Sequence, residues 1–133
     1  LKHRLMSIGE DQTFCEEWIS SLPGGTPVFG NLRCGAWYVP PSTATCYFKS
    51  TDGHFGNWQV SSSRLNLHVA ASAIKSPRGV LIVDSTRKGK TFPDSLTKTV
   101  PIWCTVLNRI ALELKRSAPN CNNMKSLDTW DID

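Results

Sequence analysis

The chain has 133 residues, of which 40% are hydrophobic and 20% are charged, a balance typical of one globular domain and not of a disordered segment. No apolar stretch approaches the roughly 18 residues that span a bilayer, so we expect no membrane partner. The net charge is +4, but residues 49 to 98 carry eight cations against three carboxylates, which makes this segment +5 and the rest −1. This asymmetry favours a polyanionic partner over a merely soluble basic surface.

The first predicted element is a helix, because apolar residues recur at spacings of three and four up to a break at Ser20–Gly25. Two short strands, 35–39 and 44–48, flank the turn Pro40–Ser42, and we expect them to form a hairpin. A helix is expected over 64–75, although residues 65–69 also alternate like a strand.

The second half of the chain gives clearer signals. Val80–Val83 is a run of four apolar residues, typical of a strand buried on both faces. Asp94 or Ser95 is expected to cap a short helix, and the strongest helix pattern runs from about Pro101 to Arg116 with Trp103 on its apolar stripe. These elements predict an α/β fold, a small mixed sheet flanked by helices, within a larger enzyme.

The five cysteines are odd in number and include no Cys-x-x-Cys pair. This pattern argues against a disulfide framework and against a zinc site, so we predict no metal site built from protein side chains alone. Free thiols are typical of a reducing compartment, and we expect a cytoplasmic protein. The start at Leu1 and the polar tail around Trp130 lead us to expect a single domain, or a fragment of one, from a longer protein.

The loop after Val83 has the composition of an anion-binding loop. Hydroxyls, a glycine and cations that follow a buried strand bring backbone N–H groups and positive charge to one place. Gly89–Thr91 is similar to part of a nucleotide-binding loop, but Asp84 stands where that motif needs glycine, and no cysteine is present for phosphoenzyme chemistry. A carboxylate in this position can orient a ribose hydroxyl or hold Mg²⁺ on a pyrophosphate. The alternative is a solvated basic turn after a core strand.

A second polar cluster spans Lys49–His54. His54 has the chemistry of a general base, with Asp52 to orient it, and the alternative is a surface turn with a histidine. A histidine placed like His68 is more often a hydrogen-bonded core residue than a functional one. The segment 93–101 would place Lys98 on the same edge as the Asp84 loop, or would serve only as a connector.

The runs Tyr47–His54, Arg64–His68, Val83–Arg87 and Lys98–Cys104 resemble the eukaryotic initiator tRNA phosphoribosyltransferase family over about half of the chain. The resemblance implies transfer of a 5-phosphoribosyl group from phosphoribosyl pyrophosphate, with Mg²⁺, to a ribose 2′-OH in the T-stem of initiator tRNA. Such a mark discriminates initiator from elongator tRNA. Members of this family are longer and carry a second, phosphatase-like domain that is not evident here.

The resemblance also suggests roles for residues that match the family pattern. The candidate catalytic residues are Asp52, His54 and Asp84. The candidate residues for binding the donor and its phosphates are Lys49, Ser50, Thr51, Ser85, Thr86, Arg87, Lys88, Gly89 and Lys90. The candidate RNA-binding residues are Arg64, Asn66, His68, Asp94 and Lys98. The alternative to a transferase is a non-catalytic tRNA-binding module of a larger enzyme, and in neither case do we expect DNA as a partner.

Overall fold

The computed structural model describes residues 2–50, 56, 58–86 and 89–117, and these residues contain a three-stranded sheet with the strand order β2-β1-β3. The strands are β1 (Val28–Asn31), β2 (Ala44–Cys46) and β3 (Leu81–Val83). Both neighbouring pairs run parallel, with Asn31 opposite Cys46 and Gly30 opposite Val83. The α/β class is therefore confirmed, but the expectation of a mixed sheet is wrong.

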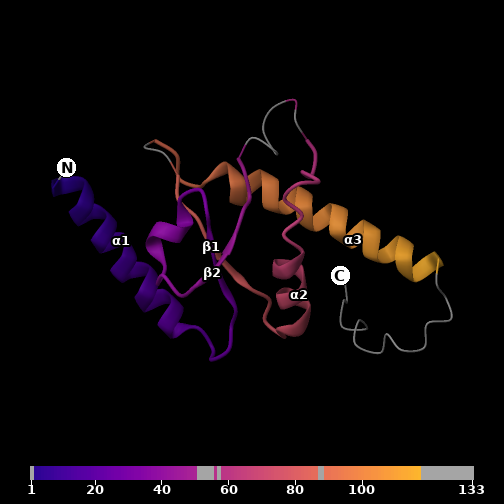
Figure 1. The fold of residues 1–133 in the computed structure, drawn as a ribbon, viewed down its shortest axis with the longest axis horizontal. Coiled ribbons are helices and arrows are strands. Elements are labelled where there is room, and N and C mark those ends of the chain that lie inside the picture. The colour runs from indigo at the N-terminus through magenta and orange to yellow at the C-terminus, as the bar shows by residue number, and fades with distance from the viewer. Residues whose placement is uncertain (1, 51–55, 57, 87–88, 118–133) are drawn as a thin grey trace.

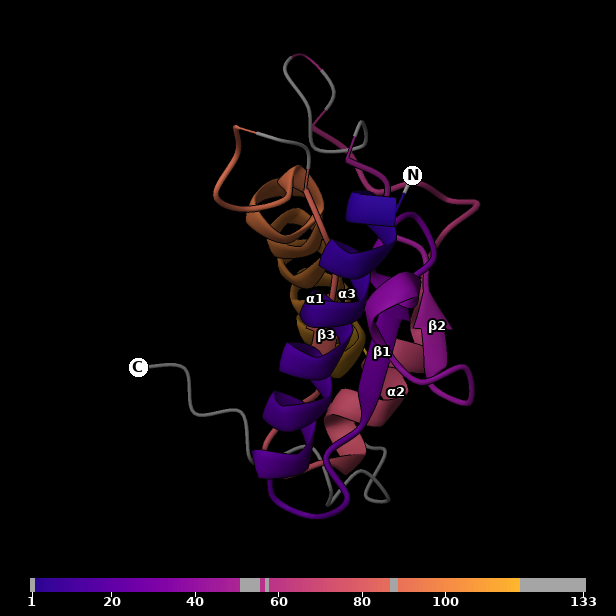
Figure 2. The ribbon, with the colours of Figure 1, turned by 90° about the vertical axis from the view of Figure 1, so that its left-hand side faces the viewer.

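Helices cover the sheet on two sides (Figures 1 and 2). The long helix α1 (Lys2–Ser21) and the short 3₁₀ helix η1 (Gly35–Tyr38) lie on one side. The helices α2 (Leu67–Lys75) and α3 (Val100–Ser117) lie on the other, and the π-helical turn η2 (Ser95–Thr99) leads directly into α3. This layering is the usual one for parallel strands, because their crossover connections place helices on the faces of the sheet.

The expected hairpin is wrong. Residues 35–38 form η1 and not a strand, and β2 pairs with β1, a strand that the sequence pattern did not reveal. The physical reason lies in two glycines that let η1 pack directly on the sheet. A Cβ atom on Gly35 would lie 1.7 Å from the carbonyl oxygen of Val83, and one on Gly30 would lie 2.8 Å from Cγ2 of Val39.

The three main helices and the core confirm the helical patterns. The core contains Phe29, Cys46, Phe48, Val69 and Trp103. Phe48 and Trp103 meet edge to face at 5.2 Å, and the indole N–H of Trp103 donates to the carbonyl of Leu65 at 2.7 Å. These contacts fix α3 against the segment that follows β2.

Two details of the later elements differ from expectation. The strand β3 is half-buried along its length and is not buried on both faces. Asp94 occupies the N-cap position of η2, but its side chain makes no capping hydrogen bond. Within the part of the chain that the structure describes, no helix combines the length and apolar character needed to cross a membrane.

Candidate functional site

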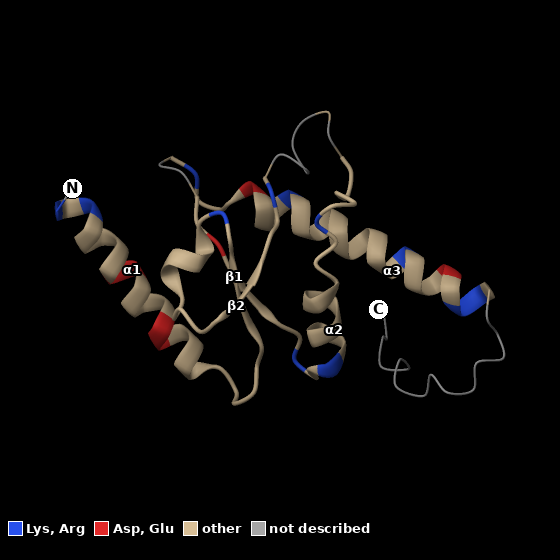
Figure 3. Cartoon of the chain, in the orientation of Figure 1, with Lys and Arg blue, Asp and Glu red and all other residues tan. Residues whose placement is uncertain are grey.

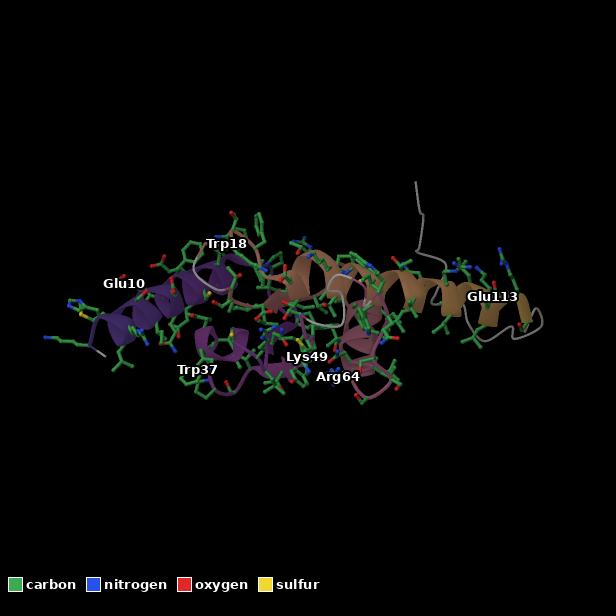
Figure 4. The ribbon with its side chains drawn as sticks, turned by 90° about the horizontal axis from the view of Figure 1, so that it is seen from above. Glu10, Trp18, Trp37, Lys49, Arg64 and Glu113 are labelled. Atoms are coloured by element: carbon green, nitrogen blue, oxygen red, sulfur yellow. The ribbon has the colours of Figure 1, made fainter. Side chains whose placement is uncertain are left out.

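The carboxyl ends of the three strands meet at one edge of the sheet and open into a hollow of about 320 Å³. Ligands of open α/β sheets bind outside the carboxyl ends of the strands, and a volume of this size suits a small molecule. Figure 4 looks down on this end of the sheet, with Lys49 near the centre of the view. We call this feature the strand-end hollow, and its lining residues are Arg33, Cys34, Ser50, Asp84, Ser85, Thr86, Lys90, Pro93, Asp94 and Ser95.

Asp84 is held at the strand-end hollow by three hydrogen bonds from residues that the structure describes. Its Oδ2 accepts from Nδ2 of Asn31 at 2.8 Å and from the hydroxyl of Ser95. Its Oδ1 accepts from the backbone N–H of Ser85 at 2.8 Å. Since an ionised carboxylate offers about four acceptor positions, roughly one remains on Oδ1 for a ligand.

Asn31 is one of the residues of this site that sequence reasoning missed. Its side chain is fully buried at 0% exposure, and besides binding Asp84 it donates to the carbonyl of Phe48 and accepts from the N–H of Phe48, both at 2.9 Å. One amide of the central strand thus connects the segment after β2 to the carboxylate after β3. Its position at the carboxyl end of a parallel strand is the signal that would have identified it, had β1 been recognised.

The turn η2 supports the same two segments from the side of α3. Ser95 binds Asp84, and the hydroxyl of Thr99 donates to the carbonyl of Lys49 at 2.9 Å. Both residues are buried, with exposures of 1% and 7%. The expected proximity of the 93–101 segment to the Asp84 loop is therefore confirmed.

Positive side chains surround the strand-end hollow. The guanidinium of Arg33, which sequence reasoning also missed, donates to the hydroxyl of Ser50. Lys90 forms an ion pair with Asp94, and Lys98 lies 3.7 Å from the same carboxylate. The hollow therefore combines one carboxylate held by neutral donors with cations at its rim. Such an arrangement can accept hydroxyls or a cation at Asp84 and anionic groups at the rim.

Four of the five candidate RNA-binding residues do not line this hollow, and Arg64, Asn66 and His68 contact other segments. Asn66 is buried with φ of 49°, and its amide binds both backbone groups of Tyr47, at 2.9 and 3.0 Å. Nε2 of His68 lies 2.9 Å from the carbonyl oxygen of Thr45. The guanidinium of Arg64 lies over the ring of Tyr47, at 5.4 Å from its centre. Asn66 and His68 thus have roles within the fold, whereas Asp94 lines the hollow and Lys98 lies 3.7 Å from its carboxylate.

Other predicted site residues lie outside the described part of the chain. They are Thr51, Asp52, His54, Arg87 and Lys88. The catalytic roles of Asp52 and His54 therefore stay predictions.

Cys46 has a thiol that is poorly suited to act as a nucleophile. Burial, with a further contribution from the charge of Asp84, raises the pKa of the Cys46 thiol from 9.0 to about 12. Burial also raises the pKa of Cys15 and of Cys104. These thiols hold their protons at neutral pH, so none of the three is suited to covalent phosphoryl chemistry.

Comparison with known proteins shows the family. The model described as the Rit1 N-terminal domain matches residues 1–131. A protein of Saccharomyces cerevisiae named tRNA A64-2′-O-ribosylphosphate transferase is 47% identical over 115 residues, which cover 85% of this chain and 22% of that protein. An uncharacterized protein of Schizosaccharomyces pombe is 50% identical over 123 residues, which cover 90% of this chain and 27% of that protein.

The chain thus spans about a quarter of the length of these relatives, and no solved structure matches it. The family model covers nearly the whole chain, and the matches to the two relatives cover 85% and 90% of it. The chain belongs to the Rit1 family, and it matches that family's N-terminal domain.

Proposed function

We propose that this domain binds the donor in a transferase that moves a 5-phosphoribosyl group from phosphoribosyl pyrophosphate to a ribose 2′-OH of initiator tRNA. The name of the S. cerevisiae relative supports ribosylphosphate transfer to tRNA. The observation that carries the proposal is the strand-end hollow, where Asp84 is held at the end of β3 and Arg33, Lys90 and Lys98 lie around it. A sugar with several phosphates has the matching chemistry, because its hydroxyls suit a carboxylate and its phosphates suit cations.

The reaction forms a bond between the 2′-oxygen of the tRNA and the anomeric carbon of the donor, and breaks the bond from that carbon to pyrophosphate. The anomeric carbon becomes cationic while the leaving group gains negative charge. The rim cations would stabilise the pyrophosphate, and Asp84 would orient a ribose hydroxyl or stabilise the developing cation. The proton of the 2′-OH passes to a base, for which Asp52, His54 and Asp84 remain the candidates.

Magnesium fits this site as a partner of the donor. The described residues contain no group of three or more histidine, cysteine or acidic side chains that could hold a metal alone. Mg²⁺ is usually bound through one or two carboxylates together with substrate phosphates, and Asp84 and Asp94 both line the hollow. When bound, the ion would neutralise charge on the pyrophosphate, with Asp84 as its first protein partner.

The second candidate function is a tRNA-binding module without chemistry of its own. The observation that favours it is the coverage, because the matched region is only 22% and 27% of the two relatives. A module would bind initiator tRNA with its rim cations but would not need Asp84. Removal of this carboxylate therefore separates the two functions.

The test measures transfer of labelled phosphoribosyl from phosphoribosyl pyrophosphate to initiator tRNA by the full-length protein, with elongator tRNA as the specificity control. Asp84→Ala should lower the rate at least about 100-fold and change the Kd for tRNA less than about twofold, because the carboxylate acts on the donor. Asp11→Ala, which removes an exposed carboxylate of α1, is the matched control and should keep full activity. Normal transfer by Asp84→Ala would contradict the proposal and would support the module, because a module does not need this carboxylate.

A further inference from the structure

We infer that Asn31 and Ser95 are positioning residues that hold the carboxylate of Asp84 with one acceptor position of Oδ1 left for the ligand. The inference rests on the proposed function. It assigns roles to two buried residues that act through Asp84 and do not take part in the bond changes of the reaction. It follows from the hydrogen bonds around Asp84 and from the burial of their donors.

The amide of Asn31 can adopt only one orientation. Its two N–H groups donate to the carbonyl of Phe48 and to Oδ2 of Asp84, while its oxygen accepts from the N–H of Phe48. A flip of the amide would place its oxygen against two acceptors and its N–H groups against a donor. Since the side chain is 0% exposed, water cannot compensate, and Oδ2 of Asp84 is fixed relative to the central strand.

Ser95 fixes the same oxygen from a second direction. Its hydroxyl donates to Oδ2 from the first position of η2, and the residue is 1% exposed. Two donors now fill the acceptor positions of Oδ2, while Ser85 occupies one position on Oδ1. Among the described residues, the acceptor position without a donor is therefore on Oδ1, the oxygen that we assign to the ligand.

Folding alone does not call for this arrangement. Four polar residues are buried among the described residues, Asn31, Asn66, Ser95 and Thr99, and all four bind a segment that follows β2 or β3. Buried polar groups stabilise a fold less than apolar packing unless every partner is present. Such groups gathered at the carboxyl ends of parallel strands fit the preorganisation of a site, where a shift of about 1 Å lowers a rate about 100-fold.

The Ser95 series tests this role. Ser95→Ala removes one donor to Asp84 and should lower kcat about 10- to 100-fold while the KM values for donor and tRNA change less than about threefold. Ser95→Thr keeps the hydroxyl but adds a methyl group at a site that is 1% exposed, so it should melt at a lower temperature than Ser95→Ala. It should nevertheless keep at least about threefold more activity than Ser95→Ala. Because activity and stability then change in opposite order, a merely structural role cannot give this result.

Thr97→Val is the matched control, because it removes a hydroxyl of the same helical turn that does not line the hollow and that, among the described residues, donates to the carbonyl of Pro93 alone. It should keep the wild-type kcat. Asn31→Ala should show the same loss of kcat as Ser95→Ala. If the Asn31→Ala protein does not fold, the Ser95 variants alone test the role, because Asn31 and Ser95 donate to the same oxygen, Oδ2 of Asp84.

Two results would overturn the inference and are distinguishable from failure of the proposed function. If Asp84→Ala is inactive while Ser95→Ala is fully active, the transferase stands and the positioning role is wrong. If the activities of the Ser95 variants follow their melting temperatures, the role is structural. If Asp84→Ala is itself fully active, the proposed function fails.

Discussion

Cys46 is the residue whose thiol is affected both by its own burial and by the charge of the half-buried Asp84. The thiol is 2% exposed and lies opposite Asn31 in the β1–β2 register. Its pKa is raised to about 12, first by burial and then by the negative charge of Asp84. The folded protein therefore keeps this proton at pH values where an unfolded chain with a pKa near 9.0 releases it.

This difference predicts a loss of stability at alkaline pH. Because the folded state binds the proton more tightly, the stabilisation is complete below pH 9.0 and is lost as the pH rises toward 12. Between pH 8 and about 10.5, the wild type should lose up to about 2 kcal/mol more free energy of unfolding than Cys46→Ala, as measured by urea denaturation at each pH. Equal pH dependence of the two proteins would show that the thiol is not perturbed.

At this scale, sequence reasoning found one part of the site and missed another. Asp84, Ser85 and Lys90 could be predicted because they directly follow an apolar run. Asn31 and Arg33 could not, because their partners are distant: Asn31 binds Phe48, 17 positions away, and Asp84, 53 positions away. Contacts over such separations depend on the strand order, which a local pattern does not contain.

At the scale of elements, the packing of η1 against the sheet shapes the strand-end hollow. Gly35 lies against the end of β3, and its missing side chain lets Arg33 and Cys34 reach the same edge as Asp84. A Cβ atom there would lie 1.7 Å from the Val83 oxygen and 2.5 Å from the Val83 carbonyl carbon. Both atoms belong to the backbone of β3, so the contact cannot be relieved by a rotamer change.

Gly35→Ala should therefore destabilise the protein by about 3 kcal/mol or more, since η1 must move away from β3. Gly9→Ala is the matched control, because Gly9 lies inside α1 and a Cβ atom added to it would have no neighbour within 4 Å. That change should stabilise the protein by about 0.5 to 1 kcal/mol through helix propensity. Urea denaturation of both variants is the measurement, and a Gly35→Ala protein of wild-type stability would contradict the close contact.

The same scale explains which elements could be predicted. Helices α2 and α3 each bury an apolar face, so their local patterns were sufficient, whereas the 20-residue helix α1 was predicted correctly although none of its residues is buried. The strands have only three or four residues, and β1 ends in Gly30 and Asn31, which are poor strand formers. Pro40–Ser42 resembled a hairpin turn because two β-rich runs flank it, but parallel pairing with β1 left the first run free to form η1.

At the scale of the whole molecule, positive charge gathers at two opposite ends of the sheet. Figure 3 shows lysine and arginine on the loops beyond the carboxyl ends of the strands and again at the turn that follows α2. The first region contains Arg33 and Lys90, and the second contains Lys75 and Arg78. The strand-end hollow lies in the first region, so the proposed function requires that the tRNA backbone approach this end.

The salt dependence of tRNA binding tests this orientation. Each phosphate contact that is lost should lower the slope of log K against log salt by about 0.7 to 0.9. Arg33→Ala should therefore lower the slope by about 0.7 to 0.9, the value for one phosphate contact. Lys90→Ala should have a smaller effect, because Lys90 is already paired with Asp94. Arg78→Ala, at the opposite end of the sheet, should leave the slope unchanged.

The measurement is the Kd for initiator tRNA in the absence of donor between about 50 and 200 mM KCl. A slope that falls for Arg78→Ala but not for Arg33→Ala would place the tRNA beyond α2, too far from Asp84 for its ribose to receive the transferred group.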